Sequence, residues 1–250
     1  MKTSSVDAVI LCGGLGTRLR SVIGESPKPM AEFDHEPFLN VLLKDLKAQG
    51  FRRAILCAGY KGKVIEEYYR THDLGIPIIV SKEPSPLGTG GAIKYAQKFL
   101  KSDPFLVLNG DSFCRMDYSK FLAFHIRKKA LASMAVVQLK DTKDFGLILL
   151  GQARRIIGFF EKTPLKARVG GKLIVGINAG IYCFNQDICS LFPKKPRVSL
   201  EYDIFPKLVN KRFFGFEVKE NFIDIGTPER YQTAQTLLKR DKDDYQNAQH

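Results

Sequence analysis

Residues 6–20, VDAVILCGGLGTRLR, place an apolar run directly before a turn that carries three glycines and two arginines. The run from Val6 to Cys12 predicts a strand that is buried on both faces of a sheet. Glycines after such a strand let backbone N–H groups approach phosphate oxygens, and cations such as Arg18 and Lys28 can supply the opposing charge. An ordinary strand-to-helix turn with surface cations is the alternative interpretation of this stretch alone.

Similar apolar runs recur through the first half of the chain, and segments with helical spacing separate them. The first of these segments has apolar residues at intervals of three and four from Phe38 to Leu46, and Gly50 ends the pattern. The expected strands are Val6–Cys12, Arg53–Ala58, Ile76–Ser81, Phe105–Leu108 and Ser133–Leu139, and the further helices are Lys61–Thr71, Gly91–Lys101 and Tyr118–Lys129. This alternation predicts a Rossmann-like, doubly wound, mostly parallel α/β sheet.

After about residue 140 the pattern changes to closely spaced strands with fewer helices. The strand-like stretches are FGLILL (145–150), RIIGFFEK (155–162), KLIVGINAGIYCF (172–184) and FFGFEV (213–218). We expect them to form a small antiparallel insertion, so that the sheet is mixed overall. A final helix is predicted over 227–240, capped by Thr227 with Pro228 in its first turn. The sequence thus predicts one domain over residues 1–240 and a polar, frayed tail over 241–250.

The composition limits the classes of protein to be considered. The net charge of +13 favours an anionic partner, but the cations are spread along the whole chain and do not identify the anion. No apolar run is long enough for a membrane helix and the first residues do not form a signal peptide, so we expect a cytosolic protein without a membrane partner. The five cysteines form no C-x-x-C pair, which predicts reduced thiols in the core.

The glycine turn does not match two common phosphate-binding motifs. A dinucleotide fingerprint requires a third glycine where this chain has Leu19, and a Walker A loop requires a Gly-Lys-Ser/Thr that the segment lacks. The pattern that remains is G-G-x-G-x-R-L over residues 13–19, followed by P-K-P-M over residues 27–30.

Five further motifs follow this pattern in order along the chain. They are EPSPLGTGGA (83–92), FLVLNGD (105–111), FFEK (159–162), INAGIY (177–182) and FIDIGTPERY (222–231). Together with the glycine turn they resemble the signature of the sugar nucleotidyltransferases, which join a nucleoside triphosphate to a sugar 1-phosphate. The resemblance runs from about residue 6 to residue 231, and it implies the nucleotide-diphospho-sugar transferase type of α/β fold.

This resemblance implies a reaction in which a phosphate oxygen of the sugar 1-phosphate attacks the α-phosphorus of the triphosphate and pyrophosphate leaves. The attacking phosphate is already ionised, so the protein mainly holds two anions together and neutralises developing charge. Asp111 follows a predicted buried strand, where open α/β sheets place their ligands. By resemblance, Asp111 and Asp224 bind one Mg²⁺, which prefers carboxylate oxygens.

The resemblance also assigns the other site residues. The residues implied in catalysis are Arg18, Lys28, Asp111, Lys162 and Asp224, with Arg18 and Lys28 on the triphosphate and Lys162 on the attacking sugar phosphate. The residues implied in nucleotide binding are Leu11, Gly13, Gly14, Gly16, Glu83, Gly88 and Thr89. The residues implied in binding the sugar phosphate are Gly146, Glu161, Lys162 and Asn178.

Glu83 is the residue that bears on the choice of base. A carboxylate only accepts hydrogen bonds, which suits the adjacent N1–H and N2–H₂ donors of guanine better than the N–H between two carbonyls of uracil or thymine. GTP is therefore the favoured triphosphate. Nothing in the sequence reads the sugar directly, but the motifs most resemble the short guanylyltransferases of D-glycero-α-D-manno-heptose 1-phosphate.

Several alternatives stay open at this level. Within the class, the sugar could be mannose or an amino sugar, or the triphosphate could be UTP or CTP. From other classes, a catalytically silent regulatory subunit would share the fold, and a nucleic-acid-binding protein would share the charge. The intact set of Arg18, Lys28, Asp111, Lys162 and Asp224 favours the enzyme, without a nucleic-acid partner. The chain is expected to be a monomer or a homodimer.

Overall fold

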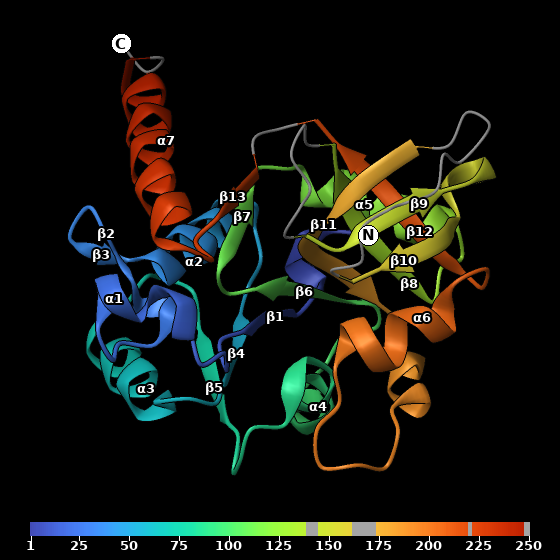
Figure 1. The fold of residues 1–250 in the computed structure, drawn as a ribbon, viewed down its shortest axis with the longest axis horizontal. Helices are drawn as coiled ribbons and strands as arrows, with labels where there is room; N and C mark the ends of the chain where they lie inside the picture. Colours follow the sequence, from blue (N-terminus) through green and yellow to red (C-terminus); the bar gives the residue numbers. More distant parts are fainter. Residues whose placement is uncertain (139–144, 162–173, 220–221, 248–250) are drawn as a thin grey trace.

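A computed structural model of the chain describes residues 1–138, 145–161, 174–219 and 222–247. In this described part the centre is a nine-stranded mixed sheet in the order β10-β9-β11-β6-β1-β4-β5, with β8 paired to β11 and β12 paired to β8 (Figure 1). Its strands are β1 Ala8–Leu11, β4 Ala54–Ala58, β5 Ile78–Lys82, β6 Phe105–Asn109, β8 Ala132–Val137, β9 Leu147–Leu150, β10 Ile156–Phe160, β11 Ile174–Phe184 and β12 Phe213–Val218.

The described residues also contain seven α-helices, several short 3₁₀ helices and two small two-stranded antiparallel sheets. The helices are α1 Arg20–Ile23, α2 Phe38–Ala48, α3 Gly62–Thr71, α4 Gly88–Ala96, α5 Tyr118–Arg127, α6 Phe205–Leu208 and α7 Pro228–Asn247. The small antiparallel pairs are β2 Glu32–Phe33 with β3 Glu36–Pro37, and β7 Ser112–Cys114 with β13 Phe222–Asp224.

The first strand is buried on both faces because its side chains alternate between two hydrophobic clusters. Ala8 and Ile10 belong to the cluster that includes residues of α2, α3 and α5, whereas Val9 belongs to the cluster that includes residues of α4 and α6. Such alternation is the period of an extended strand, and burial on both faces explains the near-continuous apolar run in the sequence. The helices therefore cover both faces of the sheet, as the doubly wound prediction requires.

Parallel pairing in the first half brings several strand ends to one edge of the sheet. β1 lies between β4 and β6 and is parallel to both, and Leu11 at its end is paired in register with Asn109 of β6. The turn after β1 and the segment after β6 therefore leave the sheet side by side. This is the edge at which open α/β sheets bind their ligands.

The strands of the second half join the same sheet. β11 is antiparallel to β6, β8 and β9, and β12 is parallel to β8. The pairing of β11 with β8 shifts register between Asn178 and Tyr182, which marks a bulge in β11. The mostly parallel, mixed α/β sheet expected from the sequence is thus the observed architecture.

The last helix is longer than the sequence predicts. α7 begins at Pro228, directly after Thr227, but it continues to Asn247, so the expectation of a frayed tail from residue 241 is wrong for residues 241–247. The polar composition suggested fraying, yet residues 229–247 contain no glycine or proline that would end a helix. In Figure 1 the far end of α7 stands away from the sheet.

The cysteines agree with the expectation of reduced thiols in the core. All five cysteines are free and buried. Within the described ranges, none of the helices combines the length and the apolar character that crossing a bilayer requires.

Candidate active site

Three segments meet at the carboxyl edge of β1 and β6, and glycines allow their close approach. Gly16 has a left-handed φ of 59°, and a Cβ at this position would lie 3.1 Å from Cβ of Lys28. A Cβ on Gly110 would lie 2.7 Å from the carbonyl oxygen of Leu11. The glycine turn, the Lys28 segment and the end of β6 therefore pack directly against one another, which larger residues would prevent.

Lys28 and Asp111 form an ion pair at this meeting point. The Lys28 Nζ lies 2.6 Å from Oδ2 of Asp111, and Lys28 is only 8% exposed. A lysine is rarely buried unless it has a partner, so Asp111 accounts for its position. Arg18 lies in the short 3₁₀ turn Thr17–Leu19 that follows Gly16, and its side chain is exposed.

Asp224 lies beside Asp111 although the two are far apart in the sequence. β13 is paired with β7 so that Asp224 stands opposite Ser112, and the N–H of Ile225 donates to the carbonyl oxygen of Asp111 over 3.0 Å. Burial raises the pKa of Asp224 above its ordinary value, and the negative charge of Asp111 raises it further. The structure thus gathers both predicted metal ligands.

Arg230 is a residue of this cluster that the sequence reasoning missed. Its Nη1 lies 2.9 Å from Oδ1 of Asp224, and its guanidinium lies 4.4 Å from the centre of the Phe145 ring. Arg230 falls in the motif FIDIGTPERY but looks like a surface charge in a helix. One signal could have identified it, because an arginine in the first turn of a helix opposes the helix dipole.

Glu83 closes over the glycine turn from the side of β5. Its Oε2 accepts a hydrogen bond from the N–H of Leu87 over 3.0 Å, and its Oε1 would lie 2.6 Å from a Cβ on Gly13. Burial raises the pKa of Glu83, and the Leu87 N–H offsets part of this rise. The Glu83 carboxylate therefore lies against Gly13.

Gly14, in contrast, faces open space, because apart from its chain neighbours no residue has an atom within 4 Å of a Cβ placed there.

Gly88 and Thr89 are the first two residues of α4, and both contact the segment of residues 198–201. Gly88 has a φ of 77°, and a Cβ there would lie 2.6 Å from the carbonyl oxygen of Val198. The Thr89 hydroxyl donates to Oε2 of Glu201 over 2.9 Å and accepts from the N–H of Leu200 over 2.8 Å. Side-chain contacts of Thr89 are thus made within the protein, a role that its motif did not indicate.

The residues predicted to bind the sugar phosphate form a second group. The carbonyl oxygen of Gly146 accepts from the N–H of Asn178 over 3.0 Å, and a Cβ on Gly146 would lie 2.7 Å from Oε2 of Glu161. The Asn178 side chain donates to the Tyr182 hydroxyl over 2.9 Å. The structure therefore brings Gly146, Glu161 and Asn178 together. Lys162 lies outside the described residues.

The bulge of β11 connects this sugar-site group to the aspartates. Gly180 has a φ of 71°, and a Cβ there would lie 2.8 Å from both Nδ2 of Asn109 and Oγ of Ser112. Asn109 and Ser112 flank the Gly110-Asp111 turn. The sugar-site group, through the bulge of β11, and Asp111 consequently both lie at the segment Asn109–Ser112 that follows β6.

The donor set fits a divalent cation that also has ligands outside the protein. Asp111 and Asp224 offer hard carboxylate oxygens, which Mg²⁺ prefers, and Mg²⁺ is commonly held by one or two carboxylates together with substrate phosphates and water. In the described part of the chain, no cluster of three or more His, Cys, Asp or Glu side chains forms a complete metal cage. The two aspartates would therefore hold the ion only in part.

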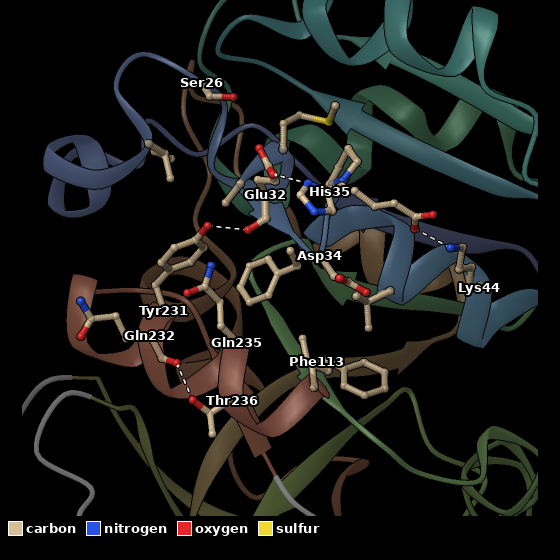
Figure 2. Close-up of a pocket in the computed structure, with 18 of the residues that line it drawn as sticks. Ser26, Glu32, Asp34, His35, Lys44, Phe113, Tyr231, Gln232, Gln235 and Thr236 are labelled. Carbon is tan, nitrogen blue, oxygen red and sulfur yellow. Dashed lines mark hydrogen bonds and ion pairs between the residues drawn. The ribbon is translucent and has the colours of Figure 1, made fainter. Parts of the chain in front are cut away.

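A cavity of about 1490 Å³ adjoins these segments, and none of the predicted site residues lines it. Its lining includes Met30, Phe113 and Tyr231, which follow closely after Lys28, Asp111 and Asp224 in the sequence. Figure 2 shows Tyr231 on α7 donating to the carbonyl oxygen of Glu32 across this cavity. The cavity thus adjoins the charged segments without including their charged groups.

Known proteins resemble this chain over nearly its whole length. The sequence profile described as "Nucleotidyl transferase" matches residues 7–241. The D-glycero-alpha-D-manno-heptose 1-phosphate guanylyltransferase of Aneurinibacillus thermoaerophilus is 38% identical over 235 residues, which cover 94% of this chain and 99% of that protein. The mannose-1-phosphate guanylyltransferase of Mycobacterium tuberculosis is 35% identical over 244 residues, which cover 96% of this chain and 66% of that protein.

Solved structures give the same result. HddC from Yersinia pseudotuberculosis complexed with GMP-PN has a TM-score of 0.79 and 35% sequence identity, and the match covers 93% of this chain and 99% of that one. The inositol-1-phosphate CTP transferase of T. maritima shares the fold at a TM-score of 0.71 and 20% identity, with 92% of this chain and 93% of that one covered. The chain belongs to the nucleotidyl transferase family.

Proposed function

We propose that this protein joins GTP to a sugar 1-phosphate and releases pyrophosphate. The observation that carries the proposal is the convergence of the glycine turn, the Lys28–Asp111 ion pair and Asp224 at the carboxyl edge of the sheet. A purely binding protein has no need for two acids, Asp111 and Asp224, that are each paired with a cation, Lys28 or Arg230, at such a point. Relatives named as guanylyltransferases support the same assignment.

In the proposed reaction an oxygen of the sugar phosphate forms a bond with the α-phosphorus of GTP. The bond from that phosphorus to the bridging oxygen of the β-phosphate breaks, and pyrophosphate leaves on the opposite side. Lys28 and Arg18 bind the triphosphate, and the backbone of Gly13, Gly14 and Gly16 approaches its oxygens. No residue has to remove a proton, because the nucleophile is already an anion.

Asp111 and Asp224 are proposed to hold Mg²⁺, with the remaining ligands supplied by phosphate and water. When bound, Mg²⁺ supplies positive charge that stabilises the oxygens on which negative charge develops. Lys28 keeps Asp111 in place through the 2.6 Å ion pair.

Guanine is the proposed base because Glu83 offers a carboxylate beside the glycine turn. Its Oε2 is held by the Leu87 N–H, while Oε1 lies at Gly13 and can accept a hydrogen bond from a base donor. Leu11, Gly88 and Thr89 are proposed to complete the nucleotide site through their backbones. The GMP-PN complex of HddC, a relative at 35% identity, supports a guanine nucleotide.

The sugar is proposed to be D-glycero-α-D-manno-heptose, since the relative from Aneurinibacillus thermoaerophilus named for this substrate aligns with 94% of this chain. Gly146, Glu161 and Asn178 would contact its hydroxyl groups, and Lys162 would bind its phosphate. Mannose 1-phosphate is the second candidate, favoured by the relative from Mycobacterium tuberculosis.

We further propose that residues 1–240 form a single domain that works in the cytosol as a monomer or homodimer.

A panel assay of pyrophosphate release tests these assignments together. Each of GTP, ATP, UTP and CTP is combined with heptose, mannose and glucosamine 1-phosphates, with Mg²⁺ or with EDTA. We expect release from GTP with heptose 1-phosphate in the presence of Mg²⁺ only. Release with UTP or CTP and not with GTP would refute the base assignment, and full activity in EDTA would refute the metal assignment.

A further inference from the structure

Four described side chains at the proposed metal site form two ion pairs whose charges balance without any metal. Asp111 is paired with Lys28 over 2.6 Å, and Asp224 is paired with Arg230 over 2.9 Å. The two negative and two positive formal charges of these side chains cancel. A divalent cation that approaches the nucleotide-free site therefore meets no net negative charge among these four groups.

Arg230 is fixed at this place by its surroundings. The side chain is 26% exposed and that of Asp224 is 16% exposed, so solvent screens their attraction only in part. The guanidinium lies on the Phe145 ring at 4.4 Å, and Phe145 in turn makes an edge contact with Phe222 at 5.6 Å. These contacts hold the guanidinium against the carboxylate.

The position of Arg230 is not explained by the stability of its helix. It is the third residue of α7, where the helix dipole disfavours a positive charge. The N–H groups of the first turn already supply positive potential there. The helix dipole therefore does not account for an arginine at this position, whereas the ion pair with Asp224 favours it.

We propose that Arg230 is an internal counter-cation that occupies Asp224 in the nucleotide-free enzyme and makes binding of the divalent cation depend on the triphosphate. The inference rests on the proposed function for the identity of the nucleotide and of the metal ligands. A triphosphate brings several negative charges, which change the balance in favour of the cation. Arg230 is in this account a positioning residue, because it acts through Asp224.

Titration with Mn²⁺, a paramagnetic substitute for Mg²⁺, tests the proposal in nucleotide-free protein. Electron paramagnetic resonance measures free Mn²⁺ for the wild type, Arg230→Gln, Arg230→Lys and Arg127→Gln. Arg127 is an exposed arginine at the end of α5, so its variant carries the same change of net charge as Arg230→Gln. We expect Arg230→Gln to bind Mn²⁺ about tenfold more tightly or better than the wild type, because one positive charge near a divalent ion is removed.

The other two variants show whether the effect on Mn²⁺ binding comes from the positive charge at position 230 or from the net charge of the protein. Arg230→Lys keeps the charge and should bind Mn²⁺ with nearly the wild-type affinity, and Arg127→Gln should match the wild type. A larger rise of melting temperature on addition of Mn²⁺ to Arg230→Gln than to the wild type is the second expected readout. Equal Mn²⁺ affinities for the wild type and Arg230→Gln would overturn the proposal.

If Arg230→Gln does not fold, the Mn²⁺ affinity of the wild type, measured with and without a nucleotide, tests the proposal. Its Mn²⁺ affinity should rise at least about tenfold when a non-hydrolysable GTP analogue is added, after correction for Mn²⁺ bound by the analogue alone. Tight Mn²⁺ binding without the analogue would contradict the inference. Pyrophosphate release by the wild type tests the proposed function separately, since that assay does not depend on when the cation binds.

Discussion

The two carboxylate oxygens of Glu83 have different surroundings, because Oε2 accepts a hydrogen bond from the Leu87 N–H and Oε1 lies near Gly13. Replacement of Glu83 by glutamine therefore tests whether this residue recognises the base. In Glu83→Gln the side-chain carbonyl can still accept from the Leu87 N–H, but an NH₂ group replaces the oxygen near Gly13. That group would face the donors of guanine. We expect kcat/KM for GTP to fall at least about tenfold, the effect of losing a hydrogen bond to a charged acceptor.

The matched control for this change is Glu66→Gln. Glu66 pairs with Lys82 over 2.8 Å and is 42% exposed, so its variant should leave kcat/KM unchanged. Steady-state rates with GTP and with ATP measure both variants. An unaltered preference for GTP over ATP in Glu83→Gln would show that another group reads the base.

Because His125 is buried, we expect the free energy of unfolding to depend on pH. The ring is buried, with Nδ1 2.9 Å from Oγ of Ser133 and Nε2 2.8 Å from Oδ1 of Asn185, and burial lowers its pKa below the ordinary 6.5. Between the ordinary pKa and the lowered folded one, the unfolded chain binds the proton more readily. Stability is therefore fully present above about pH 6.5 and is lost as the pH falls through the folded pKa.

Urea unfolding at pH 7.5 and pH 5.5 measures this loss. In this window the wild type should lose up to about 1.4 kcal/mol per pH unit through His125, and His125→Gln should lose less between the two pH values. His35→Gln is the control, because the His35 side chain is 94% exposed. The same pH dependence in His125→Gln as in the wild type would contradict the assignment.

Single residues differ in how far the sequence reveals them. Lys28, Asp111 and Asp224 were predicted as site residues because they stand inside motifs, and the structure places them close together. Arg230 was missed although its partner Asp224 lies only six residues before it, since the contact depends on how the turn between β13 and α7 folds. The internal contacts of Thr89 were missed for another reason, because Leu200 and Glu201 lie 111 and 112 residues away and leave no local pattern in the sequence.

At the scale of elements, the bulge of β11 is the feature with the clearest consequence. Gly180 has a left-handed φ of 71°, and a Cβ there would lie 2.8 Å from Asn109 and from Ser112. In Gly180→Ala we expect a loss of about 1–3 kcal/mol of unfolding free energy, from strain at this φ and from crowding. The KM for the sugar phosphate should rise as well, because the bulge joins the two groups of the site.

Gly14→Ala provides the stability control for this change. Apart from its chain neighbours, no residue has an atom within 4 Å of a Cβ at Gly14, and its φ is not left-handed, so the unfolding free energy should stay within about 0.5 kcal/mol of the wild type. Urea unfolding of both variants gives the comparison. A wild-type midpoint for Gly180→Ala would mean that the bulge is not constrained by glycine.

The long elements could be predicted from the sequence and the short ones could not. Periodic apolar residues gave α2, and continuous apolar runs gave β1, β4, β6 and β8, close to their observed bounds. The two-residue strands β2 and β3 and the three-residue strands β7 and β13 are too short to show a period. The end of α7 was placed too early, because polar composition was weighed above the absence of a helix-breaking residue.

At the scale of the whole molecule, the packing of α7 predicts where the domain ends. Tyr231 and Ala234 are buried, and Leu237 and Leu238 pack against the core. Truncation after Arg240 should therefore leave the melting temperature within about 2 °C of the full chain and preserve activity, whereas truncation after Thr227 should prevent folding. Differential scanning fluorimetry measures both forms. A large loss of stability in the 1–240 form would contradict a domain boundary at this point.

The most direct test of the account follows the α-phosphorus of GTP. Protein is mixed with α-³²P-labelled GTP, D-glycero-α-D-manno-heptose 1-phosphate and Mg²⁺, and the products are separated by chromatography. We expect the wild type to transfer the label into a sugar nucleotide, and folded Asp111→Asn and Asp224→Asn to lose at least about 99% of this rate, in the range seen when a charge-stabilising group is removed. Undiminished transfer by either variant, or wild-type label that never joins the sugar, would contradict the account.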